Sequence, residues 1–401
     1  MTDVELAPTA MAAGGAALAR DADGRVVFVE GALPGERVSA RLTDTRKDFA
    51  RAVAVEILEP SEDRVAPPCR ALAAGCGGCT WQHVSTAGQS RLKAEVVVDA
   101  LRRIAKLAEP PVPEPVHMAG PPLRTTARLA VSPRGRAGHR PRTGSGAVAT
   151  DACLVAHPLL EELIVDGRYP GANEVLLRVS VATGDRIVLV DRGAGDAQVP
   201  AGVRVFHEGD TRPAFLYEEV AGRRFRISAG SFFQSGPAVA AALTSAVSSS
   251  IGDALPEGGV LVDAYAGVGL FASVIGSQHP ARMVAVENDP SAVTDARVNL
   301  ADLDAKMVAV EMARWRPQPA DVVVADPARS GLGRPGVAAL AATGASRMVL
   351  VSCDPASLAR DTVLLSEAGY ALVSVQLVDA FPHTFHVETV SRFDLRRNTD
   401  R

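Results

Sequence analysis

The sequence contains no apolar run that approaches the roughly 20 residues a helix needs to cross a bilayer. Its N-terminus carries Asp3 and Glu5 ahead of a short Ala-rich stretch, whereas a secretory signal needs early positive charge and a longer apolar core. We therefore expect a soluble, cytoplasmic protein with no membrane partner. Nothing in the sequence implies an obligate protein partner.

A large excess of charge of one sign is also absent, because the formal net charge is −4. Binding to nucleic acid would then depend on local basic patches rather than on bulk charge. Cysteines are few and odd in number, at positions 69, 76, 79, 153 and 353. In a long chain without an export signal, this count argues against a disulfide framework and favours a metal-binding set or a reactive thiol.

What is present is a globular composition of 401 residues, 47% of them hydrophobic, which is enough for two or three domains. Short apolar stretches at 26–29, 36–42 and 50–58 alternate with turn residues and predict a small β barrel over residues 14–58. An amphipathic helix is expected over 89–107.

The pattern changes after residue 260. Apolar runs at 260–263, 282–286, 321–325 and 347–351 alternate with Ala-rich helical segments. This alternation is typical of an α/β domain with a doubly wound, Rossmann-like parallel sheet.

A glycine-rich turn follows the first of these runs. Gly267 and Gly269 come after the strand that ends near Asp263, and glycines let a backbone approach a ligand where a Cβ would collide. Glu287 ends the next strand, where a carboxylate can accept both hydroxyls of a ribose. A methyl donor, a nicotinamide dinucleotide and a purely structural turn all remain open, because the looser dinucleotide fingerprint permits Ala272 at its third glycine position.

Polar residues also close the later strands of this predicted sheet. In open parallel sheets, ligands lie outside the carboxyl ends of the strands, so Asp263, Glu287, Asp326 and Cys353 should line one crevice. A lone buried cysteine is most often inert, whereas a thiol at a helix N-terminus has a lowered pKa that favours reactivity. The position of Cys353 before Pro355 leaves both interpretations open.

Four runs of the sequence resemble the RNA uracil-C5 methyltransferase family and occur in its expected order. They are Gly230-Ser231-Phe232-Phe233-Gln234, Asp326-Pro327-Ala328-Arg329-Ser330-Gly331, Val351-Ser352-Cys353-Asp354-Pro355-Ala356-Ser357-Leu358-Ala359-Arg360-Asp361 and Phe381-Pro382-His383-Thr384-Phe385-His386-Val387-Glu388-Thr389-Val390. The resemblance covers essentially the whole chain. It implies transfer of a methyl group from S-adenosylmethionine to C5 of a uridine in RNA.

The resemblance also implies roles for individual residues. Cys353 would add to C6 of the uracil, which splits one hard step into easier ones, and Glu388 would then remove the C5 proton. His383 and His386 would be positioning residues at most. The implied methyl-donor site comprises Gln234, Asp263, Tyr265, Gly267, Gly269, Glu287, Glu311 and Asp326. Of these, Glu311 is the weaker candidate, on the adenine side, and Asp326 could instead lie against the uracil edge.

The remaining four cysteines form a candidate metal site. Four thiolates suit an iron–sulfur cluster or a structural zinc, and spacing alone does not separate the two. The sequence around Cys69, Cys76, Cys79 and Cys153 is similar to the iron–sulfur branch of the family, the bacterial 23S rRNA uracil-C5 methyltransferases. This similarity implies a [4Fe–4S] cluster with a role in folding and RNA docking, with zinc as the alternative.

The resemblance divides the chain into three parts. A TRAM-like RNA-binding barrel is expected at 1–62, on the match of the run 28–36. A central cluster- and RNA-binding region would occupy 63–230, with 93–123 packing on the catalytic domain, and a methyltransferase domain 231–401. Arginines 124, 128, 134, 136, 140 and 142 form a further candidate RNA contact, unless that run is only a solvated loop. Ribosomal RNA is the implied substrate and transfer RNA the alternative, and the target base must leave its stack.

Three other classes compete with this interpretation. A non-catalytic RNA-binding module would not need the intact pair of Cys353 and Glu388. An N-methyltransferase would need an aromatic residue in the run that begins at Asp326, and a dehydrogenase has no later motif in its favour. One departure from the family lies beside the nucleophile, because Asp354 replaces the usual Asn and its charge would oppose thiolate formation.

Overall fold

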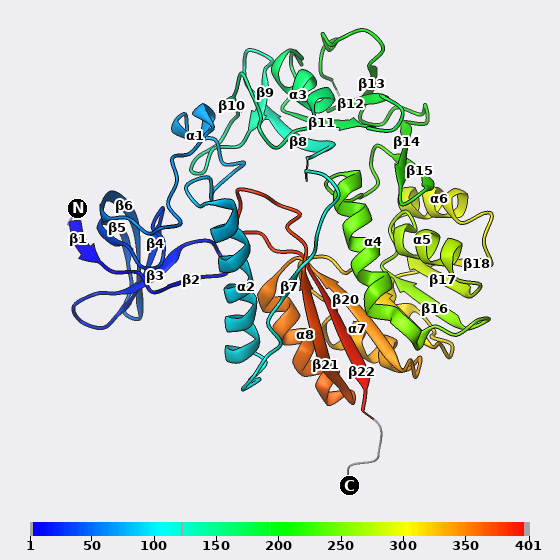
Figure 1. Ribbon diagram of the computed structural model, residues 1–401. Coiled ribbons are helices and arrows are strands. Elements are labelled where there is room, and N and C mark those ends of the chain that lie inside the picture. The colour runs from blue at the N-terminus through cyan, green and yellow to red at the C-terminus, as the bar shows by residue number, and fades with distance from the viewer. Residues whose placement is uncertain (1–2, 122, 192, 397–401) are drawn as a thin grey trace.

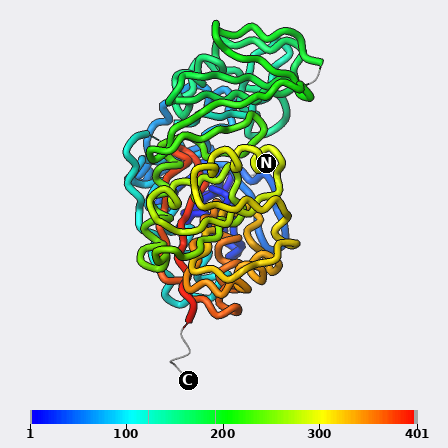
Figure 2. Tube along the Cα trace, turned by 90° about the vertical axis from the view of Figure 1, so that its right-hand side faces the viewer, coloured from blue at the N-terminus to red at the C-terminus, as the bar shows by residue number. Residues whose placement is uncertain are grey.

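The computed structural model describes residues 3–121, 123–191 and 193–396. Figure 1 shows three parts, namely a small curled sheet at the N-terminal end, a middle sheet, and a larger α/β domain. Figure 2 shows the middle sheet stacked above the α/β domain. None of the helices within the described residues is long and apolar enough to cross a membrane.

The N-terminal part is a six-stranded sheet with the order β1-β5-β6-β4-β3-β2. Its strands are β1 (Asp3–Leu6), β2 (Ala10–Met11), β3 (Ala17–Arg20), β4 (Val26–Glu30), β5 (Arg37–Thr45) and β6 (Phe49–Glu59). Alternate residues such as Val27 and Val29 point into a common core, as the period of a half-buried strand requires. The sheet begins earlier than the expected residue 14. Strand β1 gives little sequence signal because Leu6 is its one buried residue.

The middle part is a six-stranded sheet with the order β10-β9-β8-β11-β12-β13, packed on α3 (Pro158–Val165). Its strands are β8 (Thr126–Val131), β9 (Ala137–His139), β10 (Val148–Ala149), β11 (Glu174–Val179), β12 (Arg186–Val190) and β13 (Arg204–His207). The hairpin β14 (Phe215–Val220) and β15 (Arg223–Ser228) shares a core with β12, β13, α4 and α5. This hairpin therefore joins the middle sheet to the α/β domain.

The α/β domain contains an eight-stranded sheet with the order β18-β17-β16-β19-β20-β22-β21-β7. Its strands are β16 (Val260–Ala264), β17 (Arg282–Glu287), β18 (Ala305–Ala309), β19 (Val322–Ala325), β20 (Arg347–Ser352), β21 (Tyr370–Leu377), β22 (Thr389–Leu395) and β7 (Glu114–Pro115). Strands β16 to β20 are parallel, and β22 runs antiparallel between β20 and β21. Four apolar runs of the sequence correspond to β16, β17, β19 and β20.

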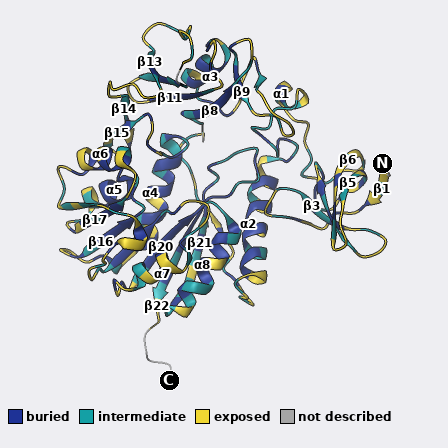
Figure 3. Ribbon diagram, turned by 180° about the vertical axis from the view of Figure 1, so that it is seen from behind, coloured by how far each residue is buried: buried dark blue, intermediate teal, exposed yellow. Residues whose placement is uncertain are grey.

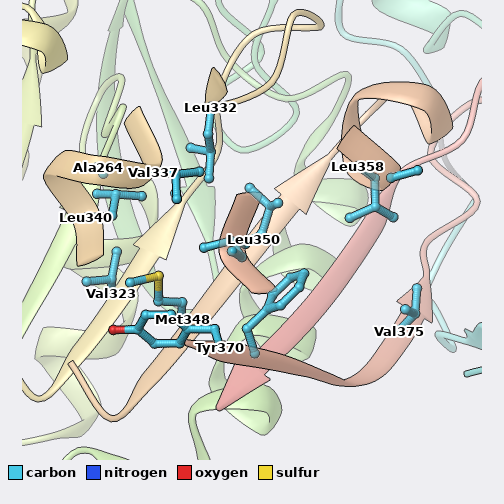
Figure 4. Packing of buried hydrophobic residues seen from close by; sticks show 14 of the residues in the cluster. Ala264, Val323, Leu332, Val337, Leu340, Met348, Leu350, Leu358, Tyr370 and Val375 are labelled. Atoms are coloured by element: carbon cyan, nitrogen blue, oxygen red, sulfur yellow. The ribbon is translucent and has the colours of Figure 1, made fainter. Parts of the chain in front are cut away.

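Helices cover both faces of this sheet. Residues of α2 (Thr86–Arg103), α7 (Gly333–Ala341) and α8 (Pro355–Glu367) share one core, and those of α4 (Pro237–Ile251), α5 (Leu270–Gln278) and α6 (Pro290–Asn299) share the other. Figure 4 shows Leu350 and Met348 of β20 among residues of the first core, and Figure 3 shows that the strands are mostly buried. Truncating a fully buried side chain such as Leu358 to alanine would cost about 2–5 kcal/mol.

Helix α2 comes from the middle of the sequence but packs on the α/β domain. Val97, Ala100 and Leu101 lie in the core that contains α8, within the segment 93–123 for which such packing was expected. The helix starts at Thr86 rather than 89 because the Ser85 side chain accepts a hydrogen bond from the Gly88 N–H and caps it. The short helix α1 (Arg70–Ala73) precedes it. This helix lies in residues 69–83, which contain Cys69, Cys76 and Cys79 and are here called the cysteine segment.

Candidate active site

The glycine turn between β16 and α5 is built by backbone conformation and by two carboxylates. Tyr265, Gly267 and Gly269 all have positive φ values, of 60°, 55° and 82°. Asp263 Oδ2 accepts from the Ala272 N–H at 2.8 Å and fixes the start of α5. A Cβ at Gly267 would meet no atom within 4 Å, so the turn leaves open space above itself.

Asp263 lies beneath this turn rather than on the wall of a crevice, because its carboxylate faces the start of α5. It is fully buried, and burial raises the pKa of its carboxyl to about 7, with smaller contributions from Asp326 and Glu287. Its Oδ1 atom has no hydrogen-bond partner among the described residues. An unpaired buried acceptor beside two further acids favours a ligand that brings positive charge.

Two pockets flank Tyr265 at the carboxyl ends of the strands. The first, here the Gln234 pocket, is lined by Gln234, Tyr265, Gly267 and Asp326 among others. The second, here the Glu287 pocket, has a volume of about 320 Å³ and is lined by Tyr265, Glu287 and Glu311 among others. Six of the eight expected donor-site residues therefore line these two pockets. The other two lie behind the surface, and for Gly269 the near neighbour is Leu300.

The acids of the two pockets are held in different ways. Glu287 accepts hydrogen bonds from the backbone N–H groups of Gly267, Asn288 and Asp289 at 2.7–2.9 Å. Asp326 accepts from Gln234 Nε2 at 3.2 Å, and burial raises the pKa of its carboxyl to about 7. The pockets together are acidic and bounded by a backbone turn that can approach a ligand.

Cys353 lies between the end of β20 and the start of α8. Its thiol is partly buried, and burial raises its pKa to about 11, reinforced by Glu388 and opposed by the positive charge of Arg329. The sequence left open whether the helix N-terminus lowers this pKa, and here burial and the nearby carboxylates raise it. Asp354 instead caps α8, since its carboxylate accepts from the Ser357 N–H at 2.7 Å.

Glu388 is brought beside Cys353 by the pairing of β20 with β22. Ser352 and Thr389 face each other in this antiparallel ladder. Cys353, which follows Ser352, and Glu388, which precedes Thr389, therefore lie at the same end of it. Glu388 is 5% exposed, and burial raises the pKa of its carboxyl well above the usual value. Asp326 raises this pKa further and Arg329 lowers it.

The four remaining cysteines, of which Cys153 is distant in sequence from the other three, line one small pocket. The thiols of Cys76, Cys79 and Cys153 have raised pKa values, chiefly through burial, and each is raised further by another cysteine of the set. In the described ranges, no group of three or more His, Cys, Asp or Glu side chains is arranged to hold a metal ion. The expected metal site at Cys69, Cys76, Cys79 and Cys153 stays a prediction.

A larger hollow, here the interdomain hollow, has a volume of about 760 Å³. It is lined by residues of the N-terminal sheet, the cysteine segment and the arginine run, and also by Phe385 of the loop before Glu388. Its arginines are Arg51, Arg128, Arg140 and Arg142. Within the run, Arg128 and Arg140 pair with Glu174, Arg136 with Asp151 and Arg142 with Glu30. The run is thus partly neutralised, which sequence reasoning did not anticipate.

Comparison with known proteins identifies the family. The TRAM domain model matches residues 9–55. A Streptomyces coelicolor protein named as an uncharacterized RNA methyltransferase is 36% identical over 97% of this chain and 92% of its own length. Another so named, from Thermosynechococcus vestitus, is 32% identical over 92% of each chain. This chain belongs to the RNA methyltransferase family.

The fold of this RNA methyltransferase is shared with a solved structure. The Pyrococcus abyssi tRNA (uracil-54, C5)-methyltransferase, in complex with S-adenosyl-L-homocysteine, matches it with a TM-score of 0.73. The match covers 97% of this chain and 99% of the other at 21% identity. At that identity the likeness establishes the fold alone.

One residue of the RNA methyltransferase site was missed from the sequence. Arg329 lies in the loop after β19, its Nη2 atom is 3.2 Å from His386 Nδ1, and its charge lowers the pKa of both Cys353 and Glu388. Burial, and in second place the positive charge of Arg329, lowers the pKa of His386 to about 4, so this ring is neutral at pH 7. Arg329 stands in the run from Asp326 to Gly331 that carries part of the resemblance to the family, so the sequence did contain a signal for it.

Proposed function

We propose that this RNA methyltransferase transfers a methyl group from S-adenosylmethionine to C5 of a uridine in RNA, with Cys353 as nucleophile and Glu388 as base. One observation carries the proposal. The Cys353 thiol and the Glu388 carboxyl stand at the same end of the β20–β22 ladder, within electrostatic range of Asp326, which lines the Gln234 pocket. A thiol and a buried carboxyl at that position suit covalent catalysis followed by proton removal.

The two pockets around Tyr265 fit the methyl donor. S-adenosylmethionine supplies an electrophilic methyl group on a sulfonium and carries a further cationic ammonium. Glu287 and Asp326 line these pockets and form an acidic environment that suits such a ligand. In this proposal Glu287 binds the ribose hydroxyls, Glu311 lies on the adenine side, and Gln234, Gly267 and Asp326 line the methionine end.

The protein's own groups then act in two steps. The Cys353 thiolate would add to C6 of the uracil, and the electron density that moves to C5 would take the methyl group as the methyl–sulfur bond of the donor breaks and leaves S-adenosylhomocysteine. Glu388 next accepts the C5 proton, the C6–S bond breaks, and the thiolate is released. One methyl group has then replaced one hydrogen at C5.

Arg329 supports both steps electrostatically. The first step needs the thiolate, and the positive charge of Arg329 opposes the burial that keeps Cys353 protonated. The second needs an ionised Glu388, and the same charge lowers the pKa of that carboxyl. A single cation therefore favours the reactive form of both groups.

The RNA would enter through the interdomain hollow. Arginine and aromatic side chains bind single-stranded RNA by contacting phosphates and by stacking on bases, and the hollow contains Arg51, Arg140, Phe28 and Phe385. Phe385 is three residues from Glu388, which links the hollow to the reacting base. We propose ribosomal RNA as the substrate, with transfer RNA as the alternative.

We further propose that Cys69, Cys76, Cys79 and Cys153 bind a [4Fe–4S] cluster. Support comes from the convergence of all four side chains on one pocket, where burial and mutual repulsion would disfavour thiolates that lack a metal. Zinc is the alternative occupant. The cluster would hold the cysteine segment against its neighbours, since the methyl transfer itself needs no electron transfer.

The direct test is incubation with an isotopically labelled methyl donor and either ribosomal or transfer RNA, followed by mass spectrometry of the nucleosides. Labelled 5-methyluridine from one RNA supports the proposal and names the substrate class. Label on another base or atom would discard the mechanism. No label, from protein that binds both RNA and donor, would favour a non-catalytic RNA-binding role.

A further inference from the structure

The loop between β21 and β22 carries Glu388 at its far end. In Figure 1 this loop, drawn in red, leaves the sheet and rises toward the first turns of α2. Its two ends are joined, because the Val378 N–H donates to the Glu388 carbonyl oxygen at 2.8 Å. The loop between them contains no helix or strand, so contacts from other segments must fix its shape.

Two side chains of α2 bind this loop. Lys93 Nζ donates to Asp379 Oδ1 at 2.6 Å and to the Phe381 carbonyl oxygen at 2.9 Å. Gln89 Oε1 accepts from the His383 N–H at 2.6 Å. Gln89 and Lys93 are one helical turn apart on the same face of α2, and each is 1% exposed.

The cysteine segment binds the same loop at His383. The Trp81 N–H donates to the His383 carbonyl oxygen at 2.7 Å, two residues after Cys79. The Trp81 indole in turn donates to the Gly15 carbonyl oxygen of the N-terminal sheet at 3.0 Å. His383 is therefore bonded through both its N–H and its C=O by two different segments.

His383 adopts a conformation that these bonds must maintain. Its φ value is +61°, in the left-handed region that a non-glycine residue rarely occupies. Such a conformation persists only where the surroundings determine it, and it occurs preferentially at functional sites. Here the determining contacts come from Gln89 and Trp81. They act on His383, which lies five residues before Glu388, the proposed base.

Burying the charged side chain of Lys93 carries a desolvation penalty, so it is an inefficient source of stability. Its side chain is fully buried, and burial lowers the pKa of its amine against the opposing effect of Asp379. Replacing a buried ion pair by apolar residues is often neutral or stabilising, so stability alone does not explain its presence. What Lys93 adds beyond packing is a pair of directional hydrogen bonds to two points of the loop, the Asp379 carboxylate and the Phe381 carbonyl.

We propose that Gln89 and Lys93 are positioning residues that place the Glu388 carboxyl for the step in which C5 of the uracil loses its proton. This inference rests on the function proposed above. Addition of the Cys353 thiolate to C6 does not involve this loop's proton acceptor, whereas breaking the C5–H bond does. Loosening the loop should therefore slow the second step more than the first.

Lys93→Met should accordingly accumulate the covalent RNA–protein adduct while turnover falls. A shift of about 1 Å in a catalytic group can cost on the order of 100-fold in rate, which sets the expected loss in kcat. Affinity for the methyl donor should stay unchanged. Gln89→Leu, which leaves the Lys93–Asp379 pair intact, should show the same accumulation.

The matched control is Arg102→Met, which removes a positive charge from the exposed side of the same helix. Arg102 forms no side-chain hydrogen bond or ion pair within the described ranges. This variant should turn over like the wild type. In a double-mutant cycle, Asp379→Leu added to Lys93→Met should cause little further loss, because the two residues act as one unit.

Single-turnover kinetics, with the covalent adduct quantified on denaturing gels, test the inference. Adduct accumulation in Lys93→Met and Gln89→Leu, with normal behaviour of Arg102→Met, supports the inference. The inference is wrong if adduct formation and product release slow equally in these two variants, or if they release product as fast as the wild type. Glu388→Gln is measured in parallel: if it traps adduct and the α2 variants do not, only this inference fails, whereas absence of adduct in Glu388→Gln contradicts the proposed function itself.

Discussion

The Thr389 hydroxyl donates a hydrogen bond to the Ser352 carbonyl oxygen at 3.1 Å, across the β20–β22 ladder. The residue after Ser352 is Cys353 and the residue before Thr389 is Glu388. The bond therefore ties together the backbones that carry the proposed nucleophile and the proposed base. Because the ladder is continuous from Arg347–Asp394 to Ser352–Thr389, their relative position is set by the rigid sheet on one side and by the loop on the other.

Replacing Cys353 by alanine should abolish methyl transfer while leaving donor binding intact. The thiol is the group that would make C5 nucleophilic, and it does not line either pocket around Tyr265. Calorimetric titration with the donor, beside a methyl-transfer assay, measures both properties. Residual activity above a few per cent of wild type would contradict the role of Cys353.

Glu388→Gln should trap the RNA covalently on Cys353. The amide keeps the shape of the side chain but does not accept the C5 proton, so the thiolate cannot be released. The adduct would appear as a band of reduced mobility on a denaturing gel. Its absence in Glu388→Gln, and its presence in a Cys353→Ala/Glu388→Gln double variant, would each count against the mechanism.

The reactivity of Cys353 in the free enzyme should rise steeply with pH. Burial raises the pKa of this thiol to about 11, so the thiolate fraction increases about tenfold per pH unit between pH 7 and 9. Peptide-resolved alkylation by iodoacetamide measures this rate for Cys353 separately from the other cysteines. Arg329→Gln should slow alkylation at a given pH and Glu388→Gln should accelerate it. A rate that levels off below pH 8 would show that the thiol is not held protonated by its site.

Asp263→Asn should stabilise the protein increasingly as pH rises. The pKa of Asp263 is about 7 in the folded state, above the unfolded value of 3.8, so its contribution to stability is full below pH 3.8 and is lost as pH rises through 7. Asparagine carries no such penalty and can still accept from the Ala272 N–H. Its advantage in the free energy of unfolding should grow by up to about 3 kcal/mol between pH 5 and pH 8.

Thermal melts at several pH values, without donor, measure this effect. The control is Asp48→Asn, at an exposed position in the N-terminal sheet region that forms no ion pair within the described residues. The control variant should track the wild type at every pH. A constant difference between Asp263→Asn and wild type from pH 5 to pH 8 would contradict the buried, protonated state of Asp263.

Protein purified without oxygen should contain about four iron atoms and matching acid-labile sulfide per chain. Cys79→Ser should lose this iron, whereas Cys353→Ser should keep it because Cys353 lies outside the four-cysteine pocket. Elemental analysis provides the measurement. One zinc and no iron would replace the cluster assignment by zinc.

Much of the molecule could be predicted from the sequence because its signals are local. The apolar runs before Asp263, Glu287, Asp326 and Cys353 give the central strands, and the order of motifs gives the RNA methyltransferase family and its TRAM domain, which the comparisons confirm. Strand β18 gave no clear signal, since each of its five residues is half-buried or exposed and they do not form an apolar run.

What could not be predicted depends on long-range contacts. A helix N-terminus can lower the pKa of a thiol, but burial raises that of Cys353, and Glu388, from the distant loop before β22, raises it further. The arginine run looked free in the sequence because its partner Glu174 lies about 40 residues away, on a neighbouring strand. Lys93 likewise falls in the amphipathic helix expected over 89–107, and its burial depends on Asp379, almost 300 residues later in the chain.

RNA whose uridines carry deuterium at C5 offers a decisive test of methyl transfer to C5 through a Cys353 adduct. Wild-type enzyme should release one deuterium for each methyl group transferred, and Cys353→Ala should release none. Methylated nucleoside that retains its C5 deuterium would place the methyl group on another atom and exclude the proposed reaction.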